Sequence, residues 1–158
     1  QLDILTATQT TSQYRRHRFR FPGHDDGTVA IRAVTYTPDG NFIAAGNDAG
    51  MVAIWDVSRP SSQPPTLVHH VLQAHGSWIL NMQAFSDSRR FISCGADRKL
   101  HVWKVDQMYQ PLHTFDSDQT VWTLAVASNV NHAIDKAKAT ARLATGTETG
   151  WIQVFSID

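Results

Sequence analysis

Short runs of apolar residues, separated by polar turns, follow one another along most of this chain. The clearest group covers residues 74–104, where the runs Trp78–Phe85, Arg90–Cys94 and Lys99–Trp103 are rich in isoleucine, valine, phenylalanine and tryptophan. Runs of this length between turn residues are typical of β-strands and are too short for α-helices. One such group cannot bury its own apolar faces, so we expect further copies that pack against it.

The same pattern predicts strands on both sides of this central group. Their separating turns have a physical basis, as in Pro38-Asp39-Gly40, where proline fixes φ and glycine accepts a positive φ. The chain is therefore predicted to be all-β. The further strands are expected at Leu2–Thr8, Tyr14–Phe21, Val29–Tyr36, Phe42–Ala45, Val52–Trp55, Leu67–Leu72, Pro111–Phe115, Thr120–Val126 and Trp151–Phe155.

A motif of glycine, any residue and an acidic residue precedes three of these strands. Its glycines, Gly46, Gly95 and Gly146, recur about every 50 residues, close to the period of four-stranded β-propeller blades. We therefore predict one propeller segment over residues 1–158, with repeats at about 14–57, 67–105 and 110–158 and with residues 1–13 ending a preceding blade. Three repeats are fewer than the roughly 4–8 blades that close a propeller, so we expect part of a larger protein. The resemblance given below implies that it is the C-terminal part of a seven-bladed protein.

The composition excludes several classes of protein. The formal net charge of the 158 residues is +0, so no overall basic field argues for nucleic acid binding. The single cysteine, Cys94, rules out an intrachain disulfide framework and suits a reducing compartment. No apolar run approaches the roughly 18 residues of a membrane span. We expect no membrane contact and a cytoplasmic location, with the nucleus as a possible second location.

The histidines show no spacing that is typical of a metal site. They include His69, His70, His75, His101, His113 and His132. No HExxH helix or Cys/His motif is present, and strand alternation is expected to send His69 and His70 to opposite faces. No glycine-rich phosphate loop is found either. The sequence therefore predicts neither a metal nor a cofactor.

The central group contains the three residue types of a hydrolase triad, His75, Ser93 and Asp97. Trp103 lies in the same group. Their positions favour a structural relay. The indole N–H of Trp103 is expected to donate a hydrogen bond within the relay, and Asp97 to fix the tautomer of His75. Ser93 is predicted to lie in a buried strand, where a nucleophile has no access to substrate. A hydrolase that uses His75, Ser93 and Asp97 remains the less favoured alternative.

The flanking repeats contain parts of the same relay. The first repeat has His24, Asp48 and Trp55, with Ala44 at the position assigned to serine. The third has Ser117 near the histidine position, together with Ala144, Glu148 and Phe155. Partial relays of this kind fit packing better than catalysis.

Candidate partner contacts lie at one predicted end of the blades. Trp78 and Trp122 begin equivalent strands, and tryptophan and arginine are favoured interface anchors. We therefore select Trp78, Trp122 and Arg32, with Asn47 and Thr147 in the neighbouring turns. The alternative is that both tryptophans pack between blades.

Two other segments allow two interpretations each. The four arginines of Tyr14–Phe21 either bind phosphates or keep an outer strand from pairing with other sheets, and we favour the second. Ser128–Thr140, which includes a possible short helix, is either a partner contact or a tolerated surface insertion.

Gly23-His24, Trp55-Asp56, the glycine–acidic turns and the relay together resemble the WD-repeat family over nearly the whole chain. A narrower resemblance involves AHGSWILN (Ala74–Asn81), HTFDSDQTVWTLAV (His113–Val126) and the terminal WIQVFSID. These strings are similar to the last blades of the WD-repeat subunit of the superkiller complex.

The resemblance implies a non-catalytic scaffold with no cofactor. The superkiller subunit docks on a tetratricopeptide-repeat scaffold beside an RNA helicase, in a complex that supports exosome-dependent 3′-to-5′ mRNA decay. Direct nucleic acid binding is not expected. Alternatives are WD adaptors of transcription-elongation, chromatin or ubiquitin-ligase complexes.

Overall fold

The computed structural model describes residues 2–8, 13–23, 29–60, 63–128 and 141–157, and these residues form strands, turns and loops without a helix. None of the described residues therefore belongs to a helix that is able to cross a membrane. The strands are β1 (Leu2–Thr8), β2 (Gln13–Phe19), β3 (Ile31–Tyr36), β4 (Phe42–Asn47), β5 (Val52–Asp56), β6 (Thr66–Val71), β7 (Ile79–Ala84), β8 (Arg90–Gly95), β9 (Lys99–Lys104), β10 (His113–Asp116), β11 (Val121–Ser128), β12 (Ala141–Thr147) and β13 (Ile152–Ile157).

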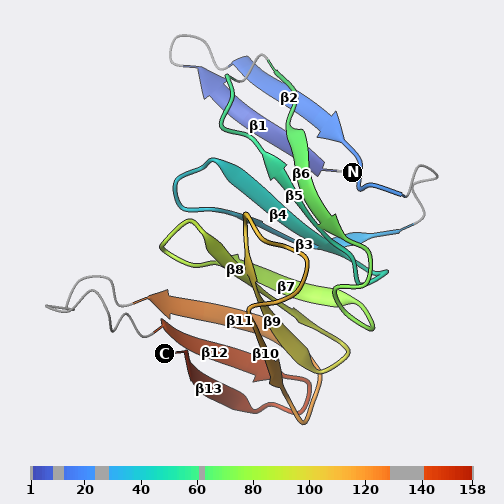
Figure 1. Ribbon diagram of the computed structural model, residues 1–158, viewed down its shortest axis with the longest axis vertical. Coiled ribbons are helices and arrows are strands. Elements are labelled where there is room, and N and C mark those ends of the chain that lie inside the picture. Colours follow the sequence, from blue (N-terminus) through green and yellow to red (C-terminus); the bar gives the residue numbers. More distant parts are fainter. Residues whose placement is uncertain (1, 9–12, 24–28, 61–62, 129–140, 158) are drawn as a thin grey trace, which may run out of the picture.

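These strands form four antiparallel sheets that follow one another along the molecule (Figure 1). The strand orders are β1-β2, β3-β4-β5-β6, β7-β8-β9-β10 and β11-β12-β13. In the last three sheets each strand pairs with its neighbour in sequence, and the first strands, β3, β7 and β11, contact one another from sheet to sheet. The predicted class, an all-β segment of a β-propeller, is confirmed.

The core lies between successive sheets. The second strands, β4 and β8, are almost wholly buried, while the outer strands β6 and β10 are largely exposed. Close approach of neighbouring sheets depends on Gly46 of β4, because a Cβ atom there would lie 2.5 Å from a methyl group of Ile79. Apolar burial of this kind is worth roughly 25 cal/mol per Å² and is the main force that stacks the sheets.

The strand pairings correct the way in which the motif glycines align the three repeats with one another. Gly46 pairs with Val52 and Gly146 with Ile152, but Cys94, rather than Gly95, pairs with Leu100. Each tight turn is instead marked by a residue of positive φ. These residues, Gly50, Arg98 and Gly150, come four positions after Gly46, Cys94 and Gly146. The expectation that the three motif glycines are equivalent is therefore wrong by one position in the central repeat, because the left-handed residue, and not the glycine, determines the turn.

The register fixes which residues occupy equivalent places in the three larger sheets. Ser93 corresponds to Ala45 in the first and to Thr145 in the last, so the assignment of Ala44 and Ala144 to this position is also wrong by one. The second strand of the last sheet, for which the sequence suggested no bounds, is β12. Residues 129–140, and with them nearly all of the predicted insertion and its possible helix, lie outside the described residues.

Candidate functional site

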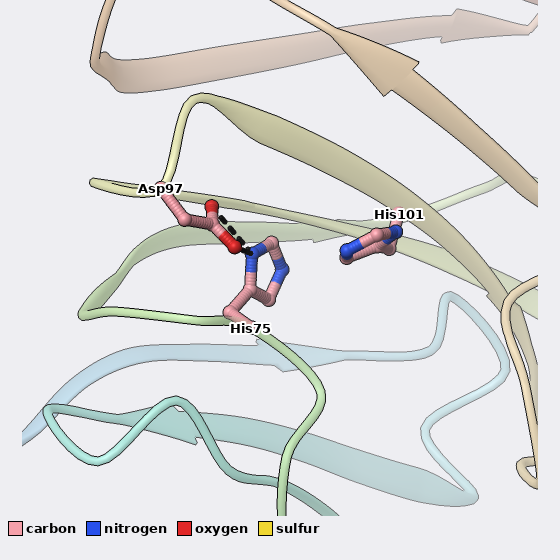
Figure 2. A group of neighbouring side chains, drawn as sticks. All are labelled: His75, Asp97 and His101. Atoms are coloured by element: carbon pink, nitrogen blue, oxygen red, sulfur yellow. Dashed lines mark hydrogen bonds and ion pairs between the residues drawn. The ribbon is translucent and has the colours of Figure 1, made fainter.

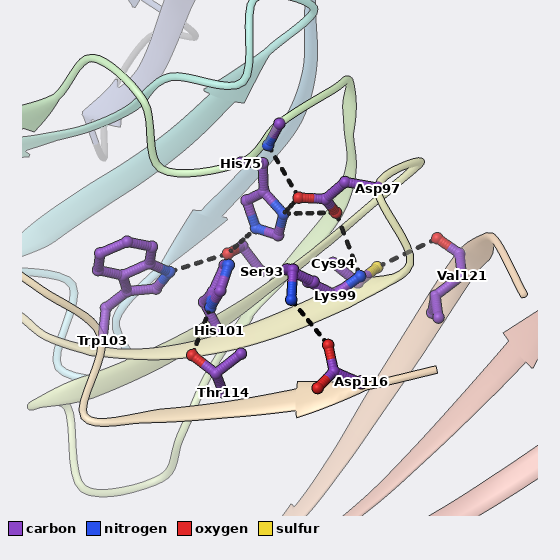
Figure 3. A network of polar contacts seen from close by, with 11 residues as sticks. His75, Ser93, Cys94, Asp97, Lys99, His101, Trp103, Thr114, Asp116 and Val121 are labelled. Atoms are coloured by element: carbon purple, nitrogen blue, oxygen red, sulfur yellow. Dashed lines mark hydrogen bonds and ion pairs between the residues drawn. The ribbon is translucent and has the colours of Figure 1, made fainter. Parts of the chain in front are cut away.

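A continuous hydrogen-bonded network joins the loop before β7 to strands β8 and β9 (Figure 3). The Nδ1 atom of His75 lies 3.0 Å from each carboxylate oxygen of Asp97. Its Nε2 atom lies 2.7 Å from Oγ of Ser93, to which Nε1 of Trp103 donates at 2.8 Å. The four residues that the sequence grouped in the central repeat are thus brought together.

The charge on Asp97 determines the direction of these hydrogen bonds. Burial raises the pKa of Asp97, but hydrogen bonds from His75 and from the backbone N–H groups of Gly76 and Lys99 outweigh it and bring the pKa down to about 2. The ionised carboxylate only accepts, so Nδ1 of His75 carries the proton and Nε2 accepts from the hydroxyl of Ser93. Each group in the chain therefore has a partner of the correct polarity.

The burial of the network opposes a catalytic role for Ser93. Its side chain is 0% exposed, and Trp103 is 1% exposed. A serine nucleophile needs a path to its substrate and an adjacent site for the reacting carbonyl. Here the Ser93 oxygen is enclosed and already bonded to two side chains, so the arrangement supports strand-to-strand attachment.

Two glycines allow the network to form. The carbonyl of Gly50 accepts a hydrogen bond from the backbone N–H of His75 at 2.9 Å, which ties the loop to the preceding sheet. A Cβ atom on Gly95 would lie 2.9 Å from Oδ1 of Asp97 and 3.0 Å from Nδ1 of His75. Only glycine therefore leaves room for this pair.

The predicted relay of the first repeat is not found among the described residues. His24 lies outside them. Asp48 forms an ion pair with Arg32 instead, and Trp55 packs against Phe19 and Phe21. Asp48 was misassigned because the glycine alignment placed it one position away from the true equivalent of Asp97, which is Ala49.

The last sheet contains a different polar network. Ser117 donates from its hydroxyl to Oε1 of Gln153 at 3.2 Å. Thr145, the equivalent of Ser93, is buried, and its hydroxyl has no hydrogen-bond partner among the described residues. Phe155, opposite Leu143 on β13, has no ring N–H to donate, so the central relay is not repeated here.

The predicted partner contacts divide into exposed and enclosed residues. Trp78 and Trp122 are 48% and 53% exposed. Arg32 is exposed as well, but its guanidinium lies 4.7 Å from the ring centre of Trp78 and pairs with Asp48. Its role is therefore to hold Trp78 in place as much as to offer a free charge.

Asn47 and Thr147 do not offer comparable contact surface. Asn47 is 0% exposed and accepts hydrogen bonds from the backbone N–H groups of Ala49 and Met51, so its prediction as a partner contact is wrong. Thr147 is half-buried, and its hydroxyl donates to Gln119. Both side chains shape their turns, which the sequence motif alone does not distinguish from binding.

The strand register reveals a surface position that the sequence reasoning missed. In β3, β7 and β11 the pairing skips one residue near the start of the strand, and these bulged residues are Arg32, Leu80 and Trp122. A bulge redirects a side chain out of the regular alternation. Leu80, which the sequence analysis did not select, therefore lies at the position equivalent to Arg32 and Trp122.

His101 is the second residue that the sequence analysis did not place in a site. Its Nδ1 atom lies 2.9 Å from the hydroxyl of Thr114, and its ring centre is 4.5 Å from that of His75. Burial is the main cause that lowers the pKa of His101 to about 4. Its separation of two residues from Trp103 places both on one face of β9, a signal that was available in the sequence.

Comparison with known proteins agrees with this architecture. The model of the family "WD domain, G-beta repeat" matches residues 15–56 and 66–104, together just over half of the chain. The chain therefore belongs to the WD40-repeat family. This assignment rests on the two repeats whose strands include β2–β5 and β6–β9.

Several relatives share part of this region. The chain is 26% identical to the Protein LST8 homolog of Drosophila melanogaster over 132 residues, which cover 79% of this chain and 41% of that protein. It is 24% identical to the Target of rapamycin complex subunit LST8 of Saccharomyces cerevisiae over 91 residues, 58% of this chain and 30% of that one. It is 27% identical to the DDB1- and CUL4-associated factor 13 of Dictyostelium discoideum over 128 residues, 80% of this chain and 26% of that protein. The chain spans less than half the length of each.

Proposed function

We propose that the protein is a non-catalytic adaptor that binds other proteins through one end of its propeller blades. The observation that carries this proposal is the exposure of Trp78 and Trp122 at the starts of β7 and β11, on a rigid, well-packed scaffold. Tryptophan side chains that remain exposed on a rigid support are favoured anchors in protein interfaces, because little conformational freedom is lost on binding. We call Arg32, Trp78, Leu80 and Trp122 the anchor face.

The contacts of the anchor face support a preformed binding surface. The guanidinium of Arg32 lies over the Trp78 indole and also forms an ion pair with Asp48. Trp78 is therefore fixed by a neighbouring blade before any partner arrives. The charge of Arg32 is already compensated, so apolar and aromatic contacts dominate the expected recognition.

The relatives favour an adaptor of a complex other than the superkiller complex. The names of two of them place the proteins in a target of rapamycin complex and among factors associated with DDB1 and CUL4. A role in a complex of either kind is our preferred proposal. The superkiller subunit, with a helical-repeat scaffold and an RNA helicase as partners, is the second candidate, and only the similarity of residues 74–81, 113–126 and 151–158 favours it.

Affinity capture from native extract tests the proposal. The tagged protein is compared with a double variant, Trp78→Ala and Trp122→Ala, and with Tyr109→Ala as the matched control, because Tyr109 is 83% exposed in the loop between β9 and β10, away from the anchor face. We expect the double variant to lose its stoichiometric partners and the control to retain them. Equal capture by all three proteins would contradict the proposed surface, and the identity of the partners distinguishes the candidate complexes.

A further inference from the structure

The turn between β8 and β9 differs from its counterparts in one residue. Arg98 has the left-handed backbone conformation, with φ of 63°, where the equivalent turns of the second and fourth sheets have Gly50 and Gly150. A residue with a Cβ atom is strained in this conformation, whereas glycine is not. The strain points to a role of the Arg98 side chain that glycine does not supply.

Arg98 also carries an uncompensated charge. It is exposed, and its guanidinium has no hydrogen bond or ion pair among the described residues. The neighbouring Lys99, by contrast, pairs with Asp116 at 2.7 Å (Figure 3). Arg32 of the anchor face pairs with Asp48. Arg98 is therefore a cation that remains available to a partner at this end of the blades.

Backbone hydrogen bonds place Arg98 between the two tryptophans of the anchor face. The N–H group of Ala96, in the same turn, donates to the carbonyl oxygen of Trp78 at 2.9 Å. The carbonyl oxygen of Arg98 accepts from the N–H group of Ser117 at 2.8 Å, in the loop that leads into β11 and to Trp122. A partner segment that contacts both tryptophans therefore passes Arg98.

The turn that carries Arg98 is held from inside its blade. Figure 2 shows the carboxylate of Asp97 directed at the ring of His75, and its Oδ1 atom lies 3.0 Å from Nδ1 of that ring. The same carboxylate accepts hydrogen bonds from the backbone N–H groups of Gly76 and Lys99. Arg98 is thus presented on a fixed backbone, so the turn loses little conformational freedom when a partner binds.

A groove of about 330 Å³ lies beside Arg98. Asp118, on the far side of the β9–β10 hairpin in sequence, is exposed, and its carboxylate has no hydrogen bond or ion pair among the described residues. Because three carboxylates line the groove, it disfavours a phosphate group, whose charge approaches −2, more than a singly charged carboxylate. The full lining is Asp97, Arg98, Lys99, Asp116, Ser117 and Asp118.

We propose that Arg98 binds the carboxylate of an aspartate or glutamate in a partner segment whose apolar residues contact Trp78 and Trp122. A guanidinium donates two parallel hydrogen bonds to a carboxylate, which gives this pair both direction and strength. The free carboxylate of Asp118 disfavours a second acidic residue nearby, which restricts the position of the first. The inference rests on the proposed adaptor function and names the chemistry of its partner.

Arg98→Gly separates binding from folding. It gives the turn the residue that Gly50 and Gly150 supply in the equivalent turns, so we expect the Tm to be unchanged or higher. Arg98→Glu reverses the charge at the same place. The matched control is Arg89→Glu, because Arg89 is an exposed arginine in the turn between β7 and β8, at the opposite end of β7 from Trp78.

The test is the selection of short random peptides, displayed on phage, by the purified chain. We expect the unchanged protein to select apolar or aromatic residues at a fixed spacing from an aspartate or glutamate. Arg98→Glu should select lysine or arginine at that position instead, and Arg98→Gly should select no charge there. Arg89→Glu should select the same peptides as the unchanged protein.

Fluorescence anisotropy with one selected peptide then measures the contact itself. Replacement of its acidic residue by the corresponding amide should weaken binding to the unchanged protein by about three- to tenfold and leave binding to Arg98→Gly unchanged. Replacement by phosphoserine should also weaken binding to the unchanged protein. Tighter binding of the phosphoserine peptide would overturn the assignment of a carboxylate.

Failure of this inference is distinguishable from failure of the adaptor proposal. If no peptide is selected, or if the double variant Trp78→Ala and Trp122→Ala selects the same peptides as the unchanged protein, the anchor face is contradicted and this inference falls with it. If selection depends on the tryptophans but shows no acidic preference, or is the same for Arg98→Glu, only the role of Arg98 is overturned.

Discussion

Replacement of Ser93 by alanine removes the oxygen that joins both halves of the central network. It leaves the indole N–H of Trp103 and the Nε2 atom of His75 without their partners, and Trp103 and His75 are 1% and 5% exposed. An unsatisfied buried polar group costs about 1–3 kcal/mol, so the two together lower the free energy of unfolding by about 2–6 kcal/mol. This is a large part of the roughly 5–15 kcal/mol that stabilises a typical domain.

Urea denaturation measures this loss, provided that the slope of free energy against denaturant is unchanged. The control is Ser156→Ala, the same exchange at an exposed position on β13, for which we expect less than about 0.5 kcal/mol. Under native conditions Ser93→Ala should still bind the same partner proteins. A loss of unfolding free energy no larger than that of the control would refute the idea that the network stabilises the blade. If Ser93→Ala instead abolished a catalytic activity of the protein, the hydrolase interpretation would be favoured.

Three further predictions follow from the same geometry. Burial is the main cause that lowers the pKa of His101 from 6.5 to about 4, so only the unfolded chain takes up this proton as the pH falls between these values. The free energy of unfolding is therefore highest above pH 6.5 and declines towards pH 4. His101→Gln should flatten that part of a pH series of denaturation curves, and an unchanged slope would count against this reasoning. Thr145→Val removes a buried hydroxyl that has no partner among the described residues, so it should raise the free energy of unfolding by about 1 kcal/mol. This effect has the opposite sign to that of Ser93→Ala at the equivalent position. A clear destabilisation would show that the hydroxyl is satisfied. Gly95→Ala should cost about 1–3 kcal/mol in the same assay, because its Cβ atom would lie 2.8 Å from the carbonyl oxygen of Trp78, and a neutral result would mean that the turn adapts.

The strands were predictable because each is a short apolar run between turns, as Arg90–Cys94 and Lys99–Trp103 illustrate. The grouping of His75, Ser93, Asp97 and Trp103 also follows from local order. Ser93 and Trp103 lie on the adjacent strands β8 and β9, and the other two residues lie in the loops at the ends of strands. What local order does not define is the register of a turn. Glycine was taken as its marker, and Arg98, with φ of 63°, has the left-handed conformation instead.

Contacts between blades were the part that the sequence did not reveal. The pairing of Arg32 with Asp48 and its position over Trp78 depend on how neighbouring sheets pack, which no spacing within one repeat records. The burial of Asn47 has a local origin instead, because its side chain turns inward and accepts hydrogen bonds from the backbone of its own turn. The proximity of His101 to His75 is likewise a property of the folded sheet that sequence spacing does not reveal.

The adaptor proposal is tested most directly by a photo-crosslinking residue at Leu80, within the anchor face. Leu80→p-benzoylphenylalanine, introduced in cells and irradiated before lysis, should crosslink to a defined partner protein. The same residue at Tyr109, away from the anchor face, should not. Crosslinks that arise only from Tyr109, or from both positions equally, would contradict the claim that this end of the blades is the binding surface.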